Sequence, residues 1–300
     1  MGISENKSII DKLEVPIRGV MRRNFSSAFD HRMLLHVDSP SDVLIYASGR
    51  RNCSSLQGHI QLKSRQDLVS LANDFLADNE EKISFEIILD QNKAAGFVFG
   101  IVPKQKTKVV LQERFDISTF TNVLNTDKID PKLAVFSESS EATNLVLSSG
   151  LSKYTNPNTG LITELFISDQ PDKKPDELDF PRRKRLIASI KIPKLDESGI
   201  PQLVDNIEFV FYLIDYICQS VSLRPETLKK LEKSRSAAYK DLQRKEDLKK
   251  QEEAAKASAL KRKIELESIE RLPIEQRRKA EEKLAMKSEK RKNQKRVIMK

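Results

Sequence analysis

The sequence predicts an α+β protein, with a single globular domain that has a mixed or antiparallel sheet and flanking helices, followed by a long charged C-terminal helix. Two observations lead to this fold class. Between residues 43 and 192, the hydrophobic pattern changes repeatedly between the period of two typical of strands and the period of 3.6 typical of helices. Beyond Arg224 there is no Gly and one aromatic residue, Tyr239, while Ala, Glu, Lys, Leu, Arg and Gln dominate. These residues are good helix formers, so we expect a helical tail.

The charge divides at the same position. The 300 residues contain 53 Lys/Arg and 44 Asp/Glu, a net charge of +9. Residues 224–300 hold 26 Lys/Arg and 14 Asp/Glu (26 − 14 = +12), which leaves 27 − 30 = −3 for residues 1–223. We therefore predict three regions, namely an amphipathic and candidate juxtamembrane segment over residues 1–29, an α+β domain over 30–222, and a basic helical tail over 223–300 that breaks near Pro273.

The first region carries apolar residues at helical spacing from residue 8 to 29, with an interruption at Pro16. The stronger helix is predicted over residues 17–29, and Arg18, Arg22 and Arg23 fall on another face of it. Its apolar stripe could dock on the domain that follows. A basic amphipathic helix can also lie on an anionic membrane surface, in which case these three arginines are membrane-proximal. Both interpretations stay open at this stage.

The globular region is predicted element by element from periodicity and turn residues. Strands are expected at residues 43–48, 59–63, 83–89, 97–102, 107–111, 133–136, 161–168 and 185–192. Helices are expected at residues 65–77, 117–124 and 141–148. A hairpin turn is predicted at residues 90–93, and the Pro-rich, charged stretch 169–181 is expected to be a surface loop.

The segment 201–221 has apolar residues on more than one face, which indicates a helix buried as the last element of the core. Beyond it, apolar positions are too sparse for a coiled-coil seam, so a solvated single helix is expected. Several acid-before-base pairs at i,i+4, such as Glu246 with Lys250, support that helix. The tail ends in a basic cluster, which consists of Arg277, Arg278, Lys279, Lys283, Lys287, Lys290, Arg291, Lys292, Lys295, Arg296 and Lys300.

Composition and motifs argue against several protein classes. The longest stretches without a charged residue are too short for a membrane-spanning helix, and the charged N-terminus is unlike a signal peptide. Two cysteines make no disulfide framework and point to a reduced compartment. The three histidines lack partners at metal-ligand spacing, and no nucleotide-binding or nucleophile-elbow motif occurs. Cys53 follows two arginines that could lower its thiol pKa, which is thin support for a nucleophile. We therefore predict no catalytic residues, no metal and no cofactor.

The basic tail favours a polyanionic partner. Lysines and arginines along a helix neutralise phosphates, and the release of counterions supplies affinity that does not depend on sequence. Few aromatic residues means little base stacking, so folded RNA fits better than single strands. A second basic run, residues 181–186 (PRRKRL), is either a nuclear-localisation string or, as we prefer, part of a surface strand at the sheet edge.

Five stretches of the chain occur in an order and spacing that is specific. They are residues 46–76 (YASGRRNCSSLQGHIQLKSRQDLVSLANDFL), 130–147 (DPKLAVFSESSEATNLVL), 166–170 (FISDQ), 184–193 (KRLIASIKIP) and 272–300 (LPIEQRRKAEEKLAMKSEKRKNQKRVIMK). Together they resemble the coiled-coil domain-containing protein 47 family, the large subunit of the PAT (protein associated with the translocon) complex. The resemblance extends from about residue 15 to residue 300.

The resemblance implies a non-enzymatic chaperone or scaffold subunit on the cytosolic face of the endoplasmic-reticulum membrane. The implied partners are the Sec61 translocon, an Asterix-type small membrane protein, nascent multi-pass membrane proteins, and the ribosome through its RNA and exit-site proteins. A membrane surface is a further candidate. The family's acidic luminal region and membrane span have no counterpart in this sequence, as expected for a fragment or shortened isoform that starts near the cytosolic part, so calcium binding is not carried over.

The alternative function is a soluble nuclear or nucleolar RNA-binding protein that uses the run 181–186 and the basic tail. An enzyme is the weakest alternative, because no catalytic constellation occurs in the sequence. It would need a polar pocket with convergent titratable groups, which only a structure can show.

Overall fold

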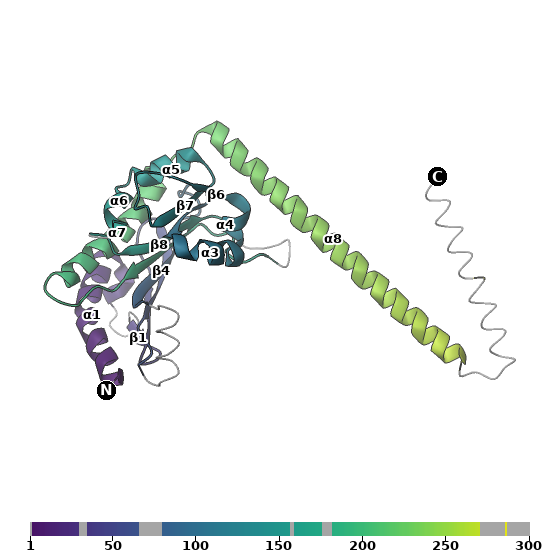
Figure 1. Ribbon diagram of the computed structural model, residues 1–300, viewed down its shortest axis with the longest axis horizontal. Helices are drawn as coiled ribbons and strands as arrows, with labels where there is room; N and C mark the ends of the chain where they lie inside the picture. Colours follow the sequence, from purple (N-terminus) through teal and green to yellow (C-terminus); the bar gives the residue numbers. More distant parts are fainter. Residues whose placement is uncertain are drawn as a thin grey trace. The chain divides into compact units, whose positions relative to one another are not determined.

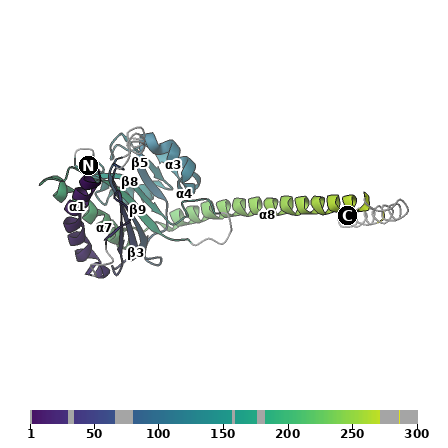
Figure 2. The same cartoon turned by 90° about the horizontal axis from the view of Figure 1, so that it is seen from below.

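The computed structural model describes residues 2–29, 35–65, 80–156, 159–175, 182–270 and 286. Within these ranges, nine strands form one sheet in the order β1-β2-β3-β4-β9-β8-β5-β7-β6, and helices lie on both of its faces (Figures 1 and 2). Every neighbouring pair of strands is antiparallel. The predicted α+β class, with an antiparallel sheet and a long C-terminal helix, is confirmed.

The strands and helices carry the labels of Figure 1. The strands are β1 Leu35–Val37, β2 Asp42–Ala47, β3 Cys53–Gln61, β4 Lys82–Leu89, β5 Phe99–Pro103, β6 Asn122–Leu124, β7 Leu133–Ser137, β8 Ile162–Ser168 and β9 Arg185–Lys191. The helices are α1 Gly2–Asn24, α3 Thr107–Glu113, α4 Phe115–Phe120, α5 Ser140–Leu147, α6 Leu151–Tyr154, α7 Gly199–Gln219 and α8 Pro225–Glu270, with short 3-10 turns at Ser26–Phe29 and Lys104–Lys106. The expected helix over residues 65–77 falls almost entirely outside the described residues.

Two hydrophobic clusters lie on opposite faces of the sheet. Alternate residues of a strand point to opposite faces, and in β5 Ile101 belongs to the large cluster while Val102 belongs to the small one. The large cluster lies under α1, α5 and α7, and it includes the edge-to-face rings of Phe25 and Phe211, whose centroids are 5.2 Å apart. The small cluster lies under α3 and α4. The sheet is therefore the middle layer of the body (Figure 2).

The N-terminal helix α1 packs on the body through its apolar stripe. Leu13, Ile17, Val20 and Met21 are buried, and they lie at the spacing of one helix face. Of the two interpretations of this segment, docking of its apolar stripe on the following domain is therefore the one seen in the structure. The predicted interruption at Pro16 is wrong, since α1 continues through it. Proline removes one backbone hydrogen bond inside a helix, and in α1 the burial of the stripe on both sides of Pro16 offsets that cost.

Helix α7 confirms the expectation of a buried last helix in the globular region. Its buried residues include Leu203, Ile207, Val210, Phe211 and Ile214. Their spacing covers more than a single narrow stripe, which is why the helix reads as almost uniformly apolar. It lies between α1 and strand β9, with which it makes its main contacts. No helix within the described residues is long and apolar enough to cross a bilayer.

Residues 107–111, predicted as a strand, form helix α3 instead. The run Val109-Val110-Leu111 is rich in β-branched residues, but Val109 is 49% exposed and only Val110 packs on the small cluster. A short apolar run does not distinguish a strand from a helix by periodicity alone. The next predicted helix, 117–124, is in fact α4 followed by the short strand β6, which pairs with β7.

The turn predicted at residues 90–93 forms, but it does not join a hairpin. The amide of Asn92 donates to the Asp90 carboxylate at 2.9 Å, as in an Asx turn. Strands β4 and β5 on either side of the turn are separated in the sheet by β9 and β8. The long connections that bring β8 and β9 between them carry no local sequence signal, so only the turn itself was predictable.

The chain divides into two compact units, Met1–Ala238 and Tyr239–Lys300, and the boundary falls inside α8. The first turns of α8 therefore belong to the body, where Leu231 is only 4% exposed. The expectation of a solvated helix from Arg224 onward is wrong for these turns. In the second unit, no described side chain is buried. The predicted break near Pro273 lies outside the described residues.

Candidate functional site

The eleven basic residues predicted to bind RNA, Arg277 to Lys300, lie outside the described residues. The three α1 arginines are described, and they do not form one exposed basic face. Arg18 contacts Glu14 one turn earlier at 2.5 Å, and Arg23 contacts Glu208 of α7 at 2.5 Å. Arg22 is half-buried. The structure thus places two of these arginines in ion pairs on the body.

The site that the described residues do build is the attachment of α8 to the body. Strands β7 and β8 flank β5, and both pair antiparallel with it. Their carboxyl ends therefore lie side by side, next to the beginning of β5. Glu138 follows β7 directly, and Asp169 follows β8 directly. The sheet topology therefore brings two carboxylates from distant parts of the sequence together.

Arg235 of α8 reaches both carboxylates. Its guanidinium donates to the two Glu138 oxygens at 3.0 and 3.1 Å, and to the two Asp169 oxygens at 2.8 and 3.2 Å. The side chains of Arg235, Glu138 and Asp169 are 12%, 3% and 16% exposed, so the cluster is shielded from water. Two bidentate contacts fix the guanidinium plane as well as its position. We call this cluster the tail anchor.

Backbone groups complete the tail anchor. The amide of Val98, immediately before β5, donates to Glu138 Oε2 at 3.1 Å. Gly96 leaves the space that Asp169 occupies, since a Cβ on Gly96 would lie 2.8 Å from Asp169 Oδ2. The start of β5 is therefore shaped to admit both carboxylates.

The electrostatics of the tail anchor follow from one cation facing two buried acids. Burial raises the pKa of Glu138 to about 7, and the nearby Asp169 adds to this shift while Arg235 opposes it. For Arg235, burial acts against the charged form, but the carboxylates of Asp169 and Glu138 outweigh it and raise its pKa. The guanidinium stays charged, and Glu138 is the group in the anchor that exchanges a proton near neutral pH.

A second contact holds the beginning of α8. Glu141 in the first turn of α5 accepts hydrogen bonds from the backbone amide of Arg224 at 3.1 Å and from the Thr227 hydroxyl at 2.5 Å. A carboxylate near a helix N-terminus also faces the positive end of the helix dipole. With Leu231 in the large cluster and Ala238 against the small one, α8 is bound to the body at four successive positions.

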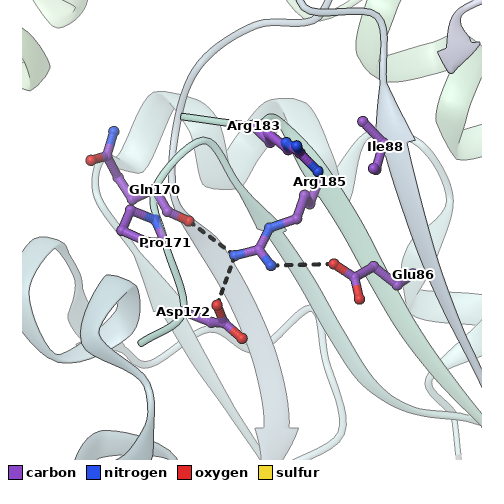
Figure 3. Close-up of a pocket in the computed structure, with 7 residues that line it drawn as sticks. All are labelled: Glu86, Ile88, Gln170, Pro171, Asp172, Arg183 and Arg185. Atoms are coloured by element: carbon purple, nitrogen blue, oxygen red, sulfur yellow. Dashed lines mark hydrogen bonds and ion pairs between the residues drawn. The ribbon is translucent and has the colours of Figure 1, made fainter. Parts of the chain in front are cut away.

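The basic run 181–186 leads into a central strand rather than the edge strand that was predicted, because β9 lies between β4 and β8. Figure 3 shows the hollow of about 320 Å³ beside it. Arg185 donates there to Glu86 at 3.2 Å, to Asp172 at 3.1 Å and to the Gln170 carbonyl at 3.3 Å. The Arg185 charge is thus used within the body, whereas Arg182 and Arg183 earlier in the run are exposed.

Neither thiol resembles a nucleophile. Burial raises the pKa of Cys53 to about 11, and Arg50 opposes this only in part. The arginines before Cys53 therefore do not make it reactive, because burial outweighs the effect of Arg50 on the thiol pKa, and Arg50 also contacts Asp215 at 2.7 Å. His59 contacts Asp42 at 2.9 Å. Among the described residues, no group of His, Cys, Asp and Glu could hold a metal ion.

Sequence reasoning missed the tail anchor. Arg235 is one of many basic residues in the tail, and nothing local distinguishes it. A weak signal did exist on the other side, because strands β7 and β8 both end in a serine followed by an acid, Ser137-Glu138 and Ser168-Asp169. Each serine hydroxyl donates to a carbonyl two residues later, at 2.9 and 3.1 Å, which gives the two strand ends the same turn.

Comparison with known proteins agrees with the resemblance found in the sequence. A family model described as PAT complex subunit CCDC47 matches residues 1–291. An endoplasmic reticulum membrane protein of Schizosaccharomyces pombe is 28% identical over 225 residues, which are 68% of this chain and 59% of that protein. An uncharacterized protein of Arabidopsis thaliana is 25% identical over 212 residues, covering 66% of this chain and 42% of that protein. The chain spans about half the length of these curated relatives. Because the family model matches nearly all of it, this chain belongs to the PAT complex subunit CCDC47 family.

Proposed function

We propose that the chain is a non-enzymatic subunit of the machinery that assists the biogenesis of multi-pass membrane proteins at the endoplasmic reticulum. In this proposal the body docks on translocon partners at the cytosolic face, including the Sec61 channel and an Asterix-type small membrane protein. The tail binds the ribosome near its exit tunnel, and the basic cluster from Arg277 to Lys300 contacts ribosomal RNA phosphates. Membership of the PAT complex subunit family and the name of the fission-yeast relative support the location.

The proposed role of the tail rests on the excess of positive charge at its C-terminal end. Residues 277–300 contain 11 Lys/Arg and 3 Asp/Glu, a net of +8, whereas residues 1–223 have a net of −3. The described part of the tail has exposed side chains, and its apolar residues Leu248 and Leu260 are 57% and 59% exposed. A helix without a buried seam is suited to a surface that it meets mainly through charge.

The tail anchor supports this role at the beginning of the helix. Arg235, Leu231 and the contact of the helix start with Glu141 attach the first turns of α8, up to Ala238, to three different parts of the body. The proposal therefore combines a basic cluster that binds RNA with a defined point at which the tail leaves the body.

The test is ribosome co-sedimentation of the full chain at a series of salt concentrations. Replacing the eleven basic residues from Arg277 to Lys300 by Gln is expected to weaken binding by about tenfold or more at low salt. It is also expected to flatten the dependence on salt, because each phosphate contact contributes about 0.7–0.9 to the slope of log K against log salt.

The matched control replaces basic residues of the middle of the tail by Gln, at Lys249, Lys250, Lys256, Lys261 and Lys263. This variant has the same helix formers but keeps the terminal cluster, so its salt slope is expected to change less per residue. An unchanged affinity after neutralisation of the terminal cluster would overturn the tail's role. A nuclear rather than reticular distribution of the native protein would favour the alternative function.

A further inference from the structure

A hollow on the outer side of α7 is not used by the tail or by its anchor. Its volume is about 310 Å³, and it lies between the short helix α6 and the outer face of α7, two neighbouring helices in Figure 1. The lining residues are Ser149, Tyr154, Asp205, Glu208, Phe209 and Tyr212. We call it the α6–α7 groove.

Three aromatic side chains, those of Tyr154, Phe209 and Tyr212, line the α6–α7 groove. The rings of Tyr154 and Phe209 are stacked, with centroids 3.8 Å apart and planes 12° apart. The ring of Tyr212 is next to that of Phe209, with centroids 6.0 Å apart, and Tyr212 is 48% exposed. Exposed, rigid aromatic rings are typical of the residues that contribute most to binding at protein interfaces.

Two carboxylates line the same groove. Asp205 and Glu208 lie one turn apart on α7, and their side chains are 54% and 43% exposed. Carboxylates beside the faces of aromatic rings form a site for a cation, since both the charge and the ring quadrupole attract it. The chemistry of the groove thus favours a Lys or Arg side chain next to an apolar group.

The chain's own side chains already demonstrate this preference. The Lys153 ammonium lies 4.8 Å from the centre of the Tyr154 ring and 3.5 Å from Asp205. Hydrogen bonding to the Tyr154 hydroxyl, together with the charges of Tyr154 and Asp205, raises the pKa of Lys153. On the other side, Arg23 contacts Glu208 at 2.5 Å. Both cations are well exposed, with side-chain exposures of 64% and 59%.

We propose that the α6–α7 groove binds a basic cytosolic segment of a membrane protein, whose Lys or Arg side chains replace Lys153 and Arg23. Exposed ion pairs contribute little, so exchanging one cation for another costs little, while the aromatic rings gain new contact area. Cytosolic loops of membrane proteins carry an excess of Lys and Arg close to their membrane spans, which matches the groove in charge. This inference rests on the proposed function, because it names how the body would meet such proteins.

Other occupants fit the groove less well. RNA phosphates and an anionic leaflet would both meet the carboxylates of Asp205 and Glu208, which repel them. A proline-rich segment could use the aromatic rings but would leave those carboxylates without a role. A basic segment uses the rings and the charges together.

The experiment measures binding of a short fluorescein-labelled peptide, in which Lys and Arg alternate with Leu and Tyr, to the full-length chain by fluorescence anisotropy. Two further peptides serve for comparison, one with every Lys and Arg replaced by Glu and one rich in proline. The basic peptide is expected to bind, and to bind more weakly at higher salt. Preferential binding of the acidic or the proline-rich peptide would overturn the proposal.

Variants of the groove make the test specific. Tyr212→Ala is expected to weaken binding of the basic peptide by about tenfold. The double variant Asp205→Asn and Glu208→Gln is expected to weaken this binding and to remove most of its dependence on salt. Lys153→Ala removes the internal competitor, so it is expected to tighten binding by about twofold to fivefold. If Lys153 had only a structural role, its removal would not increase the affinity for the peptide. Equal or weaker peptide binding by Lys153→Ala would therefore overturn the proposal that a peptide cation replaces Lys153.

Tyr239→Ala and Asp241→Asn, which change the same residue types at exposed positions of α8, are the matched controls and are expected to bind the peptide normally.

Separate measurements distinguish a failure of the groove proposal from a failure of the proposed function of the tail. Neutralising the terminal basic cluster should weaken ribosome binding and leave peptide binding intact, whereas Tyr212→Ala should weaken peptide binding and leave ribosome binding intact. A photo-crosslinker at position 212 is then expected to capture a multi-pass protein during its synthesis on microsomes. Crosslinking that persists after the Lys and Arg of its cytosolic loops are replaced by Glu would contradict the assigned partner.

Discussion

The two ends of the described part of α8 have similar sequences and opposite environments. Up to Ala238 the helix belongs to the body, with Leu231 buried and Arg235 held by two carboxylates. From Tyr239 onward no described side chain is buried, and pairs such as Lys250 with Glu246 lie at the helix surface. A basic residue in this helix is therefore either part of the fold or available to a partner, and the charge count does not say which.

The largest expected effect comes from Arg235→Ala. Removing the guanidinium leaves Glu138 and Asp169 buried and facing each other, which is expected to lower the free energy of unfolding of the body by about 3–5 kcal/mol. Urea unfolding followed by circular dichroism measures the change. Arg244→Ala is the control on the exposed part of the same helix, where the arginine is 80% exposed, and is expected to change stability by less than about 0.5 kcal/mol. Similar losses in both variants would abolish the distinction between the two ends.

The anchor also predicts a dependence on pH. The pKa of Glu138 is about 7 in the folded protein, above its usual 4.5, so the folded state holds a proton that the unfolded chain releases between these values. The resulting stabilisation is complete below about pH 4.5 and is lost as the pH rises through about 7, a change of about 3 kcal/mol. Glu138→Gln is expected to remove this part of the pH profile. An identical profile in the variant and the parent would show that Glu138 is not the titrating group.

A pair of leucines tests the same contrast without charge. Leu231→Ala removes a side chain from the large hydrophobic cluster and is expected to cost about 2–3 kcal/mol. Leu248→Ala makes the identical change at a position that is 57% exposed, and is expected to cost less than about 0.5 kcal/mol. Thermal unfolding of the two variants under one set of conditions decides the matter, and equal costs would mean that the exposed part of α8 is packed in solution.

The sequence predicted features that depend on local residues, and it failed for features that depend on contacts between distant segments. Strand 133–136 was predicted almost to the residue, because its short apolar run Leu-Ala-Val-Phe is typical of a strand covered on both faces of the sheet. Helix α1 was predicted in part, and Pro16 misled because the buried stripe that offsets it is a tertiary contact. The tail anchor was not predicted, since Glu138, Asp169 and Arg235 meet only through the order of β7, β5 and β8.

The smallest expected effect concerns α1. Because the apolar stripe of α1 is buried in the body, we expect any contact of α1 with a membrane to rely mainly on charge, with Ile3 and Val15, 56% and 76% exposed, as the apolar residues left at the surface of the helix. Replacing Arg18, Arg22 and Arg23 by Gln is expected to reduce binding to vesicles containing phosphatidylserine by a few-fold at low salt, at about 1 kcal/mol or less for each arginine. Vesicle co-sedimentation measures this, with vesicles of neutral lipid as the control. Binding that survives both the substitutions and high salt would mean that an apolar contact, rather than the arginines, holds the chain on the vesicles.

The position of β9 in the sheet has a consequence for how the chain matures. This strand, late in the sequence, lies between β4 and β8, and α7, later still, packs against α1 at the opposite end of the body's sequence. Contacts between such distant segments slow folding, typically into the range of milliseconds to seconds. During synthesis the early strands β1 to β4 have to wait, with one sheet edge open, until β9 has left the ribosome. A protein that we propose to act on unfinished chains thus passes through a long unfinished stage itself.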